Sequence, residues 1–308
     1  MYDLICVGMA LVDSIIRGFD PQPISASGYR ARSGSLNVGG EAVNEAVAAA
    51  KLGLKTAILC NLGPDTAGDM VADALKKAGV DTGRIQRRGE TPVTTMFVRE
   101  DGTRRSITNR AHRYNFHPER DPALFTDARA LMLGSLFRAP FDDPAIIESV
   151  LRSAKAAGQT VFADTKLPNF NFLTLKDVGD ALPMIDYLTP NEDEARYFSQ
   201  KDEPEEMADA FLSFGVRNVI IKLGGKGCLF KNREKRIRLP AYPIDAVDAT
   251  GAGDNFLAGF ASEILRGEKT ENALCFANAC GAVCATAVGA GTALKSRDQV
   301  LERMRAWQ

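Results

Sequence analysis

The strongest local signal in this chain is the stretch Asp248-Ala249-Thr250-Gly251-Ala252-Gly253-Asp254-Asn255-Phe256, a run of small residues between two carboxylates. Apolar residues follow at helical spacing, so Gly251 to Gly253 are predicted to turn the chain into the N-terminus of a helix. The unpaired N–H groups and the helix dipole at such a terminus favour an anion. An anion site beside a carboxylate base is what phosphoryl transfer to a hydroxyl requires. The alternative interpretation is a glycine turn that only begins a buried helix.

Two other nucleotide-binding motifs do not fit the chain. A dinucleotide-binding fingerprint needs a third glycine where Phe256 stands. A P-loop needs Gly-Lys-Ser or Gly-Lys-Thr, which the sequence lacks. The similar tetrapeptide Gly53-Leu54-Lys55-Thr56 follows a predicted helix instead of preceding one.

The bulk composition is that of an ordinary soluble globular protein. The 308 residues are 45% apolar and 25% charged, and 38 basic against 39 acidic residues give a net charge of −1. This balance argues against a nucleic-acid partner, and no apolar run is long enough to predict a membrane span. The N-terminus has no basic region typical of a signal peptide. The six cysteines form no Cys-x-x-Cys pair, so buried free thiols and a cytoplasmic location are expected.

Strand and helix patterns alternate along most of the chain. This alternation predicts an α/β fold, in which a mainly parallel sheet is covered by helices on both faces. No linker or repeat divides it, so residues 1–308 are predicted to form one domain. The predicted strands are 4–9, 56–62, 130–133, 160–163, 187–188 and 218–223, and the predicted helices are 39–53, 70–78, 143–157, 203–214 and 270–287.

Two segments interrupt the alternation. Residues 92–99 and 103–109 predict a hairpin around Asp101-Gly102, and residues 17–38 predict irregular or edge-strand structure. Lid insertions are therefore expected at about 14–38 and 90–112, although a surface hairpin without function is the alternative. Asp13 follows the first predicted strand, where open α/β sheets bind ligands, but a solvated loop aspartate is equally consistent.

Four motifs resemble those of the ribokinase-like (PfkB) carbohydrate kinase family, in the family's order and over nearly the whole chain. They are Gly39-Gly40-Glu41-Ala42-Val43-Asn44, Thr189-Pro190-Asn191-Glu192-Asp193-Glu194, Leu223-Gly224-Gly225-Lys226-Gly227 and Asp248 to Asp254. The resemblance implies a ribokinase-like three-layer α/β/α fold with a small β-lid. It also implies an ATP- and Mg²⁺-dependent kinase of a small sugar, forming a homodimer through the lid.

The resemblance assigns roles at the sugar end of the site. Asp254 matches the general base that takes the proton from the sugar hydroxyl. The backbone of Gly251, Ala252 and Gly253 matches the anion hole for the transferred phosphoryl group. The candidate substrate ligands are Asp13, Gly40, Glu41, Asn44 and Asn109.

It also assigns roles at the nucleotide end. Asn191 and Glu194 match the pair that positions Mg²⁺ and its water, with Glu194 acting through water. The implied nucleotide contacts are Asn191, Lys222, Gly224, Gly227 and Asn278, and a monovalent-cation loop is implied at Asp248, Thr250, Gly289 and Ala293. Ala287 stands where the family has an arginine beside this loop, which leaves activation by K⁺ open.

Other departures from the family pattern leave the acceptor open. Glu41 replaces a lysine that ribokinases place at the sugar, and Leu11 replaces an asparagine, so ribose is not implied. Asp13, Glu41 and Asn44 favour an uncharged polyol. Several arginines in or near the lid leave an acidic sugar possible, although solvated charge on the lid is the alternative explanation for them: Arg104, Arg105, Arg110, Arg113 and Arg138. A nucleoside or phosphosugar kinase, or a silent nucleotide-binding regulator on the same fold, are the alternatives.

Overall fold

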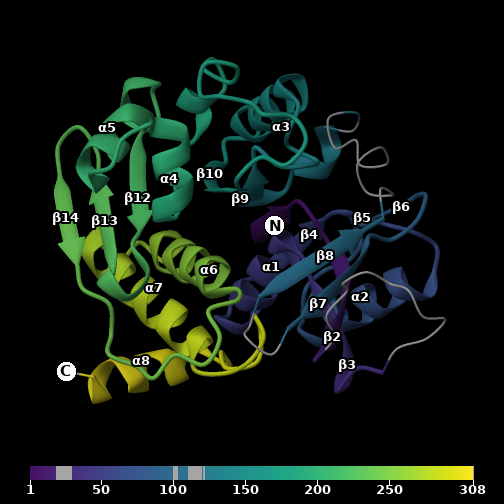
Figure 1. The fold of residues 1–308 in the computed structure, drawn as a ribbon. Coiled ribbons are helices and arrows are strands. Elements are labelled where there is room, and N and C mark those ends of the chain that lie inside the picture. The colour runs from purple at the N-terminus through teal and green to yellow at the C-terminus, as the bar shows by residue number, and fades with distance from the viewer. Residues whose placement is uncertain (19–29, 100–102, 110–119, 121, 308) are drawn as a thin grey trace.

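The computed structural model describes residues 1–18, 30–99, 103–109, 120 and 122–307 (Figure 1). An eight-stranded sheet forms the middle layer. The strand order is β14 (Arg236–Leu239), β13 (Cys228–Lys231), β12 (Asn218–Lys222), β11 (Tyr187–Leu188), β10 (Thr160–Thr165), β9 (Ala128–Leu136), β1 (Tyr2–Val7) and β4 (Thr56–Leu59). All its strands run parallel except β13, which pairs antiparallel with β12 and with the edge strand β14. The prediction of a mainly parallel sheet is confirmed.

Helices cover both faces of this sheet, as Figure 1 shows. Strand β1 explains why two faces need cover, because Leu4 and Cys6 join one apolar cluster while Ile5 and Val7 join the other, all fully buried. One cluster contains residues of α1 (Glu41–Lys51), α2 (Thr66–Lys77), α6 (Ala252–Leu265), α7 (Thr270–Ala285) and α8 (Arg297–Ala306). The other contains residues of α3 (Pro144–Ala156), α4 (Glu192–Ser199) and α5 (Pro204–Ser213). The three-layer α/β/α prediction is therefore confirmed.

A separate four-stranded sheet, called the small sheet here, lies beside the carboxyl ends of the main strands. Its order is β3 (Ser33–Gly39), β2 (Leu11–Arg17), β7 (Val93–Val98) and β8 (Arg104–Thr108). Strands β2 and β3 are inserted between β1 and α1, and β7 and β8 are inserted before β9. The two excursions meet where β2 pairs in parallel with β7. A third, two-stranded sheet joins β5 (Asn61–Leu62) to β6 (Gln86–Arg87).

Some predicted boundaries were wrong. The predicted strand 56–62 is divided between β4 and β5, and residues 11–17 form a strand, β2, that was not predicted. Residues 33–39 form β3 at the edge of the small sheet, which agrees with the edge-strand alternative for residues 17–38. Helix α2 begins four residues before the predicted start, because the Asp65 side chain accepts a hydrogen bond from the Gly68 N–H and caps it. The predicted Asp101-Gly102 turn, like parts of both predicted insertions, lies outside the described residues.

Helices α6 and α7 pack closely because of a glycine. A Cβ added at Gly259 of α6 would lie 2.7 Å from Cys280 Sγ and 3.3 Å from the Ala277 Cα of α7. Within the described ranges, no helix combines the length and apolar character needed to cross a membrane.

We predict that Gly259→Ala destabilises the protein by about 1–3 kcal/mol, because overpacking exceeds the helix-propensity gain of about 0.5–1 kcal/mol. Gly281→Ala on α7 is the matched control, since its nearest neighbour would lie at 3.3 Å and the next at 3.7 Å. Urea unfolding of both variants measures the difference. Equal stability of the two variants would contradict the packing argument.

Candidate active site

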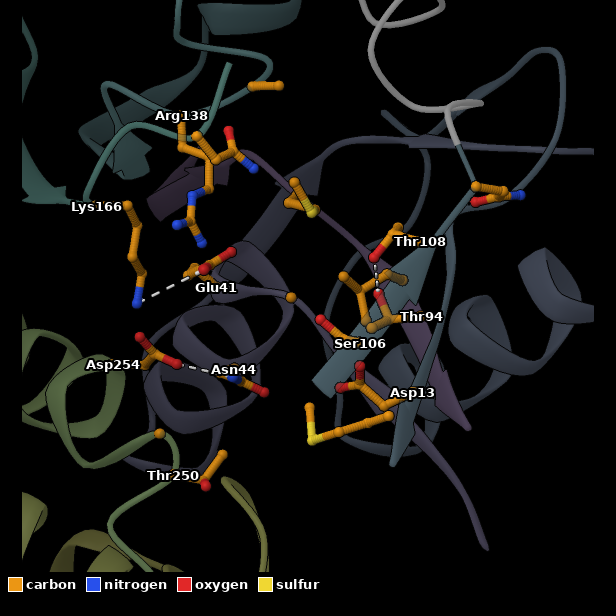
Figure 2. A pocket seen from close by; sticks show the side chains of 18 of the residues that line it. Asp13, Glu41, Asn44, Thr94, Ser106, Thr108, Arg138, Lys166, Thr250 and Asp254 are labelled. Carbon is orange, nitrogen blue, oxygen red and sulfur yellow. Dashed lines mark hydrogen bonds and ion pairs between the residues drawn. The ribbon is translucent and has the colours of Figure 1, made fainter. Parts of the chain in front are cut away.

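A cavity of about 760 Å³ lies between the main sheet and the small sheet. Its walls come from β2, β7 and β8 of the small sheet, from the N-termini of α1 and α6, and from the loops after β9 and β10 (Figure 2). The carboxyl ends of parallel strands and the N-termini of helices therefore converge on it, as expected for an α/β ligand site. The substrate candidates Asp13, Gly40, Glu41, Asn44, Asn109 and Asp254 all line this cavity.

Asp254 lies in the first turn of α6 and is only 5% exposed. Asn44 Nδ2, from the first turn of α1, donates a hydrogen bond of 2.7 Å to Asp254 Oδ2 (Figure 2). Burial raises the pKa of Asp254 to about 6, although Lys166 and the Asn44 hydrogen bond oppose that shift. The carboxylate is therefore mostly ionised at neutral pH and basic enough to accept a proton. Asparagine is unfavourable early in a helix, and this contact, not a capping role, explains its presence at position 44.

The start of α6 is shaped by glycine. Gly251 is the N-cap with φ 77°, and a Cβ there would lie 2.2 Å from the Ala290 Cβ. Of the predicted anion-hole donors, the Ala252 N–H is already bonded to the Ala249 carbonyl at 3.1 Å. The N–H groups of Gly253 and Asp254 belong to the first turn, where an α-helix offers no internal acceptor. They are the better candidates for binding an anion.

Asp13 occupies a different place from the predicted loop. It lies within β2 of the small sheet, paired with β3, and its carboxylate lies against Gly39, where a Cβ would be 2.5 Å from Asp13 Oδ2. Gly39 therefore leaves the room that the carboxylate occupies at the cavity wall. Burial, with a smaller contribution from the charge of Glu41, raises the pKa of Asp13 to about 6. Asp13 follows the first central strand and lines the cavity, as expected, whereas the alternative of a solvated loop aspartate is wrong. Its role as a substrate ligand stays a prediction.

Glu41 and Lys166 form an ion pair of 3.6 Å across the cavity floor (Figure 2). Burial opposes ionisation of Glu41, but the charge of Lys166 and several smaller contributions together outweigh burial, and the pKa of Glu41 is lowered. Burial likewise opposes the charge on Lys166, yet Glu41 and the neighbouring carboxylates raise its pKa. Gly40 begins α1 with φ 101°, and a Cβ there would lie 2.4 Å from the Met9 carbonyl oxygen. Gly40 therefore allows the backbone conformation from which α1 begins, and α1 carries Glu41 and Asn44 to the cavity.

Asn109 lines the cavity, but its amide is used by the backbone. Its Oδ1 accepts from the Val93 N–H at 2.9 Å and its Nδ2 donates to the Thr91 carbonyl at 3.2 Å. These bonds close the end of the β7–β8 hairpin. We therefore do not retain Asn109 as a direct ligand.

On the nucleotide side, Lys222 makes an ion pair of 2.7 Å with the buried Asp164. A Cβ added at Gly253 would lie 3.0 Å from Lys222 Nζ, so the ammonium group lies directly beside the N-terminus of α6. Asn191 is joined to Lys222 by an isolated β-bridge. Lys222 and Asn191 are thus brought to the same edge of the site as Asp254.

Asn191 and Glu194 form a capping box at the start of α4. The Asn191 side chain accepts from the Glu194 N–H at 2.9 Å, and Glu194 Oε2 accepts from the Asn191 N–H at 3.0 Å. Thr165 Oγ1 also donates to Glu194 Oε2 at 2.9 Å. Burial and the nearby Asp164 raise the pKa of Glu194. The predicted metal-positioning pair therefore has a structural role in this chain before any ion is bound.

The remaining predicted nucleotide contacts lie around the turn after β12. Gly224 and Gly227 have φ of 56° and 93°, and a Cβ at Gly227 would lie 1.9 Å from the Leu239 carbonyl oxygen, so this turn needs glycine. Asn278 is buried on α7, and its Nδ2 donates to the Pro240 carbonyl at 3.3 Å. That bond ties α7 to the end of β14.

The predicted cation loop is held together by Asp248. Its Oδ1 accepts from the Thr250 N–H at 3.0 Å and from Thr250 Oγ1 at 2.6 Å, and its Oδ2 accepts from the Gly289 N–H at 3.1 Å. The Ala293 carbonyl accepts a bond of 3.0 Å from Gln299 Nε2. Asp248, Thr250 and Gly289 are therefore close together, and the carbonyl of Ala293 already has a donor.

Glu45 is a residue that sequence reasoning missed. It is fully buried on α1, and neither carboxyl oxygen has a hydrogen-bond partner in the part of the chain that the structure describes. One oxygen each of Glu45, Asp164 and Asp254 lie within 4.8 Å of one another. Burial raises the pKa of Glu45 well above its usual value, and Asp254 and Asp164 raise it further, so the group is held neutral.

The geometry agrees with what comparison with known proteins finds. A family model described as pfkB family carbohydrate kinase matches residues 1–297. The probable fructokinase-5 of Arabidopsis thaliana is 28% identical over 87% of this chain and 88% of its own length. The ATP-dependent ribose-1-phosphate kinase of Halopiger xanaduensis is 32% identical over 85% of each chain. The solved structure of Arabidopsis thaliana ribokinase complexed with ribose and ATP aligns over 99% of both chains with a TM-score of 0.87 and 27% identity.

The chain therefore belongs to the pfkB family of carbohydrate kinases. Its fold is that of ribokinase, and the family and relatives make it a sugar kinase. The resemblance noted in the sequence motifs is confirmed.

We predict that Glu45→Gln stabilises the protein increasingly as the pH rises from 5 to 8. The folded-state pKa of Glu45 is raised, so the folded state binds one proton more than the unfolded state above about pH 4.5, and stability falls with pH by up to about 1.4 kcal/mol per unit. Glutamine removes that term. Urea unfolding at several pH values measures it, with the exposed Glu302→Gln as control. A stability difference that does not change with pH would show that Glu45 does not hold a proton.

Proposed function

We propose that this protein transfers the γ-phosphoryl group of Mg·ATP to a hydroxyl of a sugar or sugar-like substrate, with Asp254 as the general base. One observation carries the proposal. Asp254 is buried in the first turn of α6, is oriented by Asn44, and faces the same cavity as Asp13 and Glu41. The base, the unpaired N–H groups of a helix start and a cavity rich in polar side chains therefore coincide.

Asp254 would remove the proton from the acceptor hydroxyl. The Asn44 bond holds Oδ2, which fixes the carboxylate plane and leaves Oδ1 for the hydroxyl. The N–H groups of Gly253 and Asp254 would stabilise the negative charge that develops on the transferred group. Lys222 lies beside Gly253 and would add a positive charge, which it shares with Asp164.

The residues present fit a bound magnesium ion. Glu194 and Asp164 offer hard carboxylate oxygens at the nucleotide side, in surroundings where burial raises the pKa of Glu194 and a divalent cation would relieve the cost of its charge. Held near Glu194 and Asp164, Mg²⁺ would supply positive charge that offsets the charge of the ATP phosphates. ATP as the donor is supported by relatives whose names include it, among them these two. The monovalent-cation role of Asp248, Thr250, Gly289 and Ala293 stays a prediction.

The small sheet is proposed as a lid over the acceptor. Thr94, Ser106 and Thr108 bring hydroxyl side chains from β7 and β8 to the cavity, and Thr94 Oγ1 and Thr108 Oγ1 lie 2.9 Å apart (Figure 2). A closed sheet would exclude water and so limit hydrolysis of ATP.

The acceptor class is open to both neutral and phosphorylated sugars. Relatives of this chain are named for fructose, for ribose and for ribose 1-phosphate.

We expect Asp254→Asn to lower kcat for sugar phosphorylation about 10²- to 10⁴-fold, because the amide cannot take the proton. For the unaltered protein, kcat/KM should fall below an apparent pKa of about 6, where Asp254 becomes protonated. Asp13 titrates in the same range, so Asp13→Asn serves as control and should keep an acid limb of unit slope. ADP production over a panel of sugars, sugar acids, sugar phosphates and nucleosides measures these effects. Near-normal turnover by Asp254→Asn would exclude it as the base.

We also propose a homodimer formed through the small sheet. Leu36 on β3 and Ile107 on β8 are large apolar side chains that are 61% and 69% exposed, and a second copy of the small sheet would cover them. Sedimentation of the unaltered protein should give a dimer, and Leu36→Asp with Ile107→Asp should give a monomer. The exposed Leu167→Asp, in the loop after β10, is the control. A monomeric unaltered protein would contradict the proposal.

A further inference from the structure

The turn at the end of β9 brings the Arg138 side chain to the cavity, and two residues beside Arg138 have a costly backbone conformation. Ser135 and Phe137 have φ of 68° and 75°, values that residues with a Cβ rarely adopt. The turn is closed by the Arg138 N–H donating to the Ser135 carbonyl at 2.9 Å and by the Phe137 N–H donating to the Phe141 carbonyl at 3.0 Å. Phe137 and Phe141 are fully buried and anchor it. Between these anchors the turn presents Arg138 to the cavity.

The Arg138 side chain is oriented but its charge is not paired. Nε donates to the Leu167 carbonyl at 3.1 Å, and the guanidinium group points into the cavity above Glu41 (Figure 2). No carboxylate oxygen lies within 4.0 Å of it among the residues that the structure places. Lys166, by contrast, is paired with Glu41 at 3.6 Å. The two terminal nitrogens of the Arg138 guanidinium group can therefore donate hydrogen bonds to a substrate bound in the cavity.

We propose that Arg138 binds a carboxylate or phosphate group on the acceptor, so that this kinase acts on an anionic sugar in preference to a neutral one. The proposal rests on the kinase function proposed above. A guanidinium fork matches the paired oxygens of either group and binds them through charge-assisted hydrogen bonds. A neutral polyol would stabilise this half-buried guanidinium group much less.

The charges around the cavity also fix the orientation of such a substrate. Asp254 and Asp13 face it from the side of α6 and the small sheet, and both repel an anion when ionised. Glu41 is compensated by Lys166. The anionic group therefore belongs at Arg138, and the hydroxyl that is phosphorylated belongs at Asp254. The acceptor hydroxyl and the acid group are then on different parts of the sugar.

A different explanation is that Arg138 only supports Glu41. Burial raises the pKa of Glu41 and Lys166 lowers it; the charge of Arg138 adds a smaller lowering effect. In that case removing Arg138 would affect all acceptors alike. A specificity measurement separates the two explanations, because a binding role changes the ratio between anionic and neutral acceptors.

The experiment compares kcat/KM for matched acceptors with Mg·ATP. D-ribose is measured beside D-ribonate and D-ribose 1-phosphate, and D-glucose beside D-gluconate and D-glucose 1-phosphate, so that the terminal hydroxyl is free in each. We expect an anionic member to be preferred, and Arg138→Ala to lower the anionic-to-neutral ratio about 10- to 100-fold, mainly through KM. Arg138→Lys, which keeps a charge without the fork, should give an intermediate ratio. If Arg138→Ala lowers the ratio for the sugar acids, Arg138 binds a carboxylate; if it lowers the ratio for the sugar phosphates, Arg138 binds a phosphate.

The control is Arg105→Ala, an exposed arginine on β8 that does not line the cavity, which should leave every ratio unchanged. Calorimetric binding of D-gluconate and D-ribose 1-phosphate to Asp254→Asn, with and without Arg138→Ala, tests the same contact without turnover. Preference for neutral sugars, or an equal loss for all acceptors in Arg138→Ala, would overturn the inference and leave the kinase function standing. ATP binding with no acceptor turned over would overturn the kinase function and this inference with it.

Discussion

The hydrogen bond between Asn44 and Asp254 joins two helices whose contact residues lie 210 positions apart in the chain. It exists because α1 and α6 both begin at the same edge of the main sheet, and both begin with a glycine in a left-handed or otherwise restricted conformation. A carboxylate buried at that point needs a donor, since an unpaired buried charge is costly. The rest of the site is arranged around the same requirement.

The neighbouring buried charges follow this rule, with one exception. Glu41 is paired with Lys166, Asp164 with Lys222, and Glu194 with Thr165 and the backbone of α4. Glu45 has no hydrogen-bond partner among the residues that the structure describes, and burial with the neighbouring carboxylates raises its pKa instead. The cluster thus holds its carboxylates in fixed positions before a substrate arrives, which is the arrangement that lowers reorganisation during phosphoryl transfer. Burial of the Glu45 carboxyl group without a hydrogen bond among the described residues lowers the stability of the folded protein.

Much of this site was predictable from the chain. The small residues of 251–253 followed by a helical apolar pattern located the start of α6, and the alternation of strands and helices gave the layers. That Asp13 lies on a strand was not predictable, because a short strand of a separate sheet resembles a loop in sequence. Glu45 was missed for a related reason: a glutamate in an alanine-rich helix is typical of a solvated face, and only the tertiary packing buries it. The amide of Asn109 could not be assigned either, because the acceptor it bonds depends on how the hairpin closes.

The construction of the small sheet has a consequence for how the protein opens and folds. Each excursion supplies only a two-stranded hairpin, and an isolated hairpin is marginally stable in water. The parallel pairing of β2 with β7 joins residues 12–17 to residues 93–98, so it must wait until the main sheet has brought these distant segments together. If β2 separated from β7, β2 and β3 would keep their contacts with α2, whereas β7 and β8 would lose the strand that supports them. The second insertion, remote in sequence from the first, therefore depends on it and assembles after it.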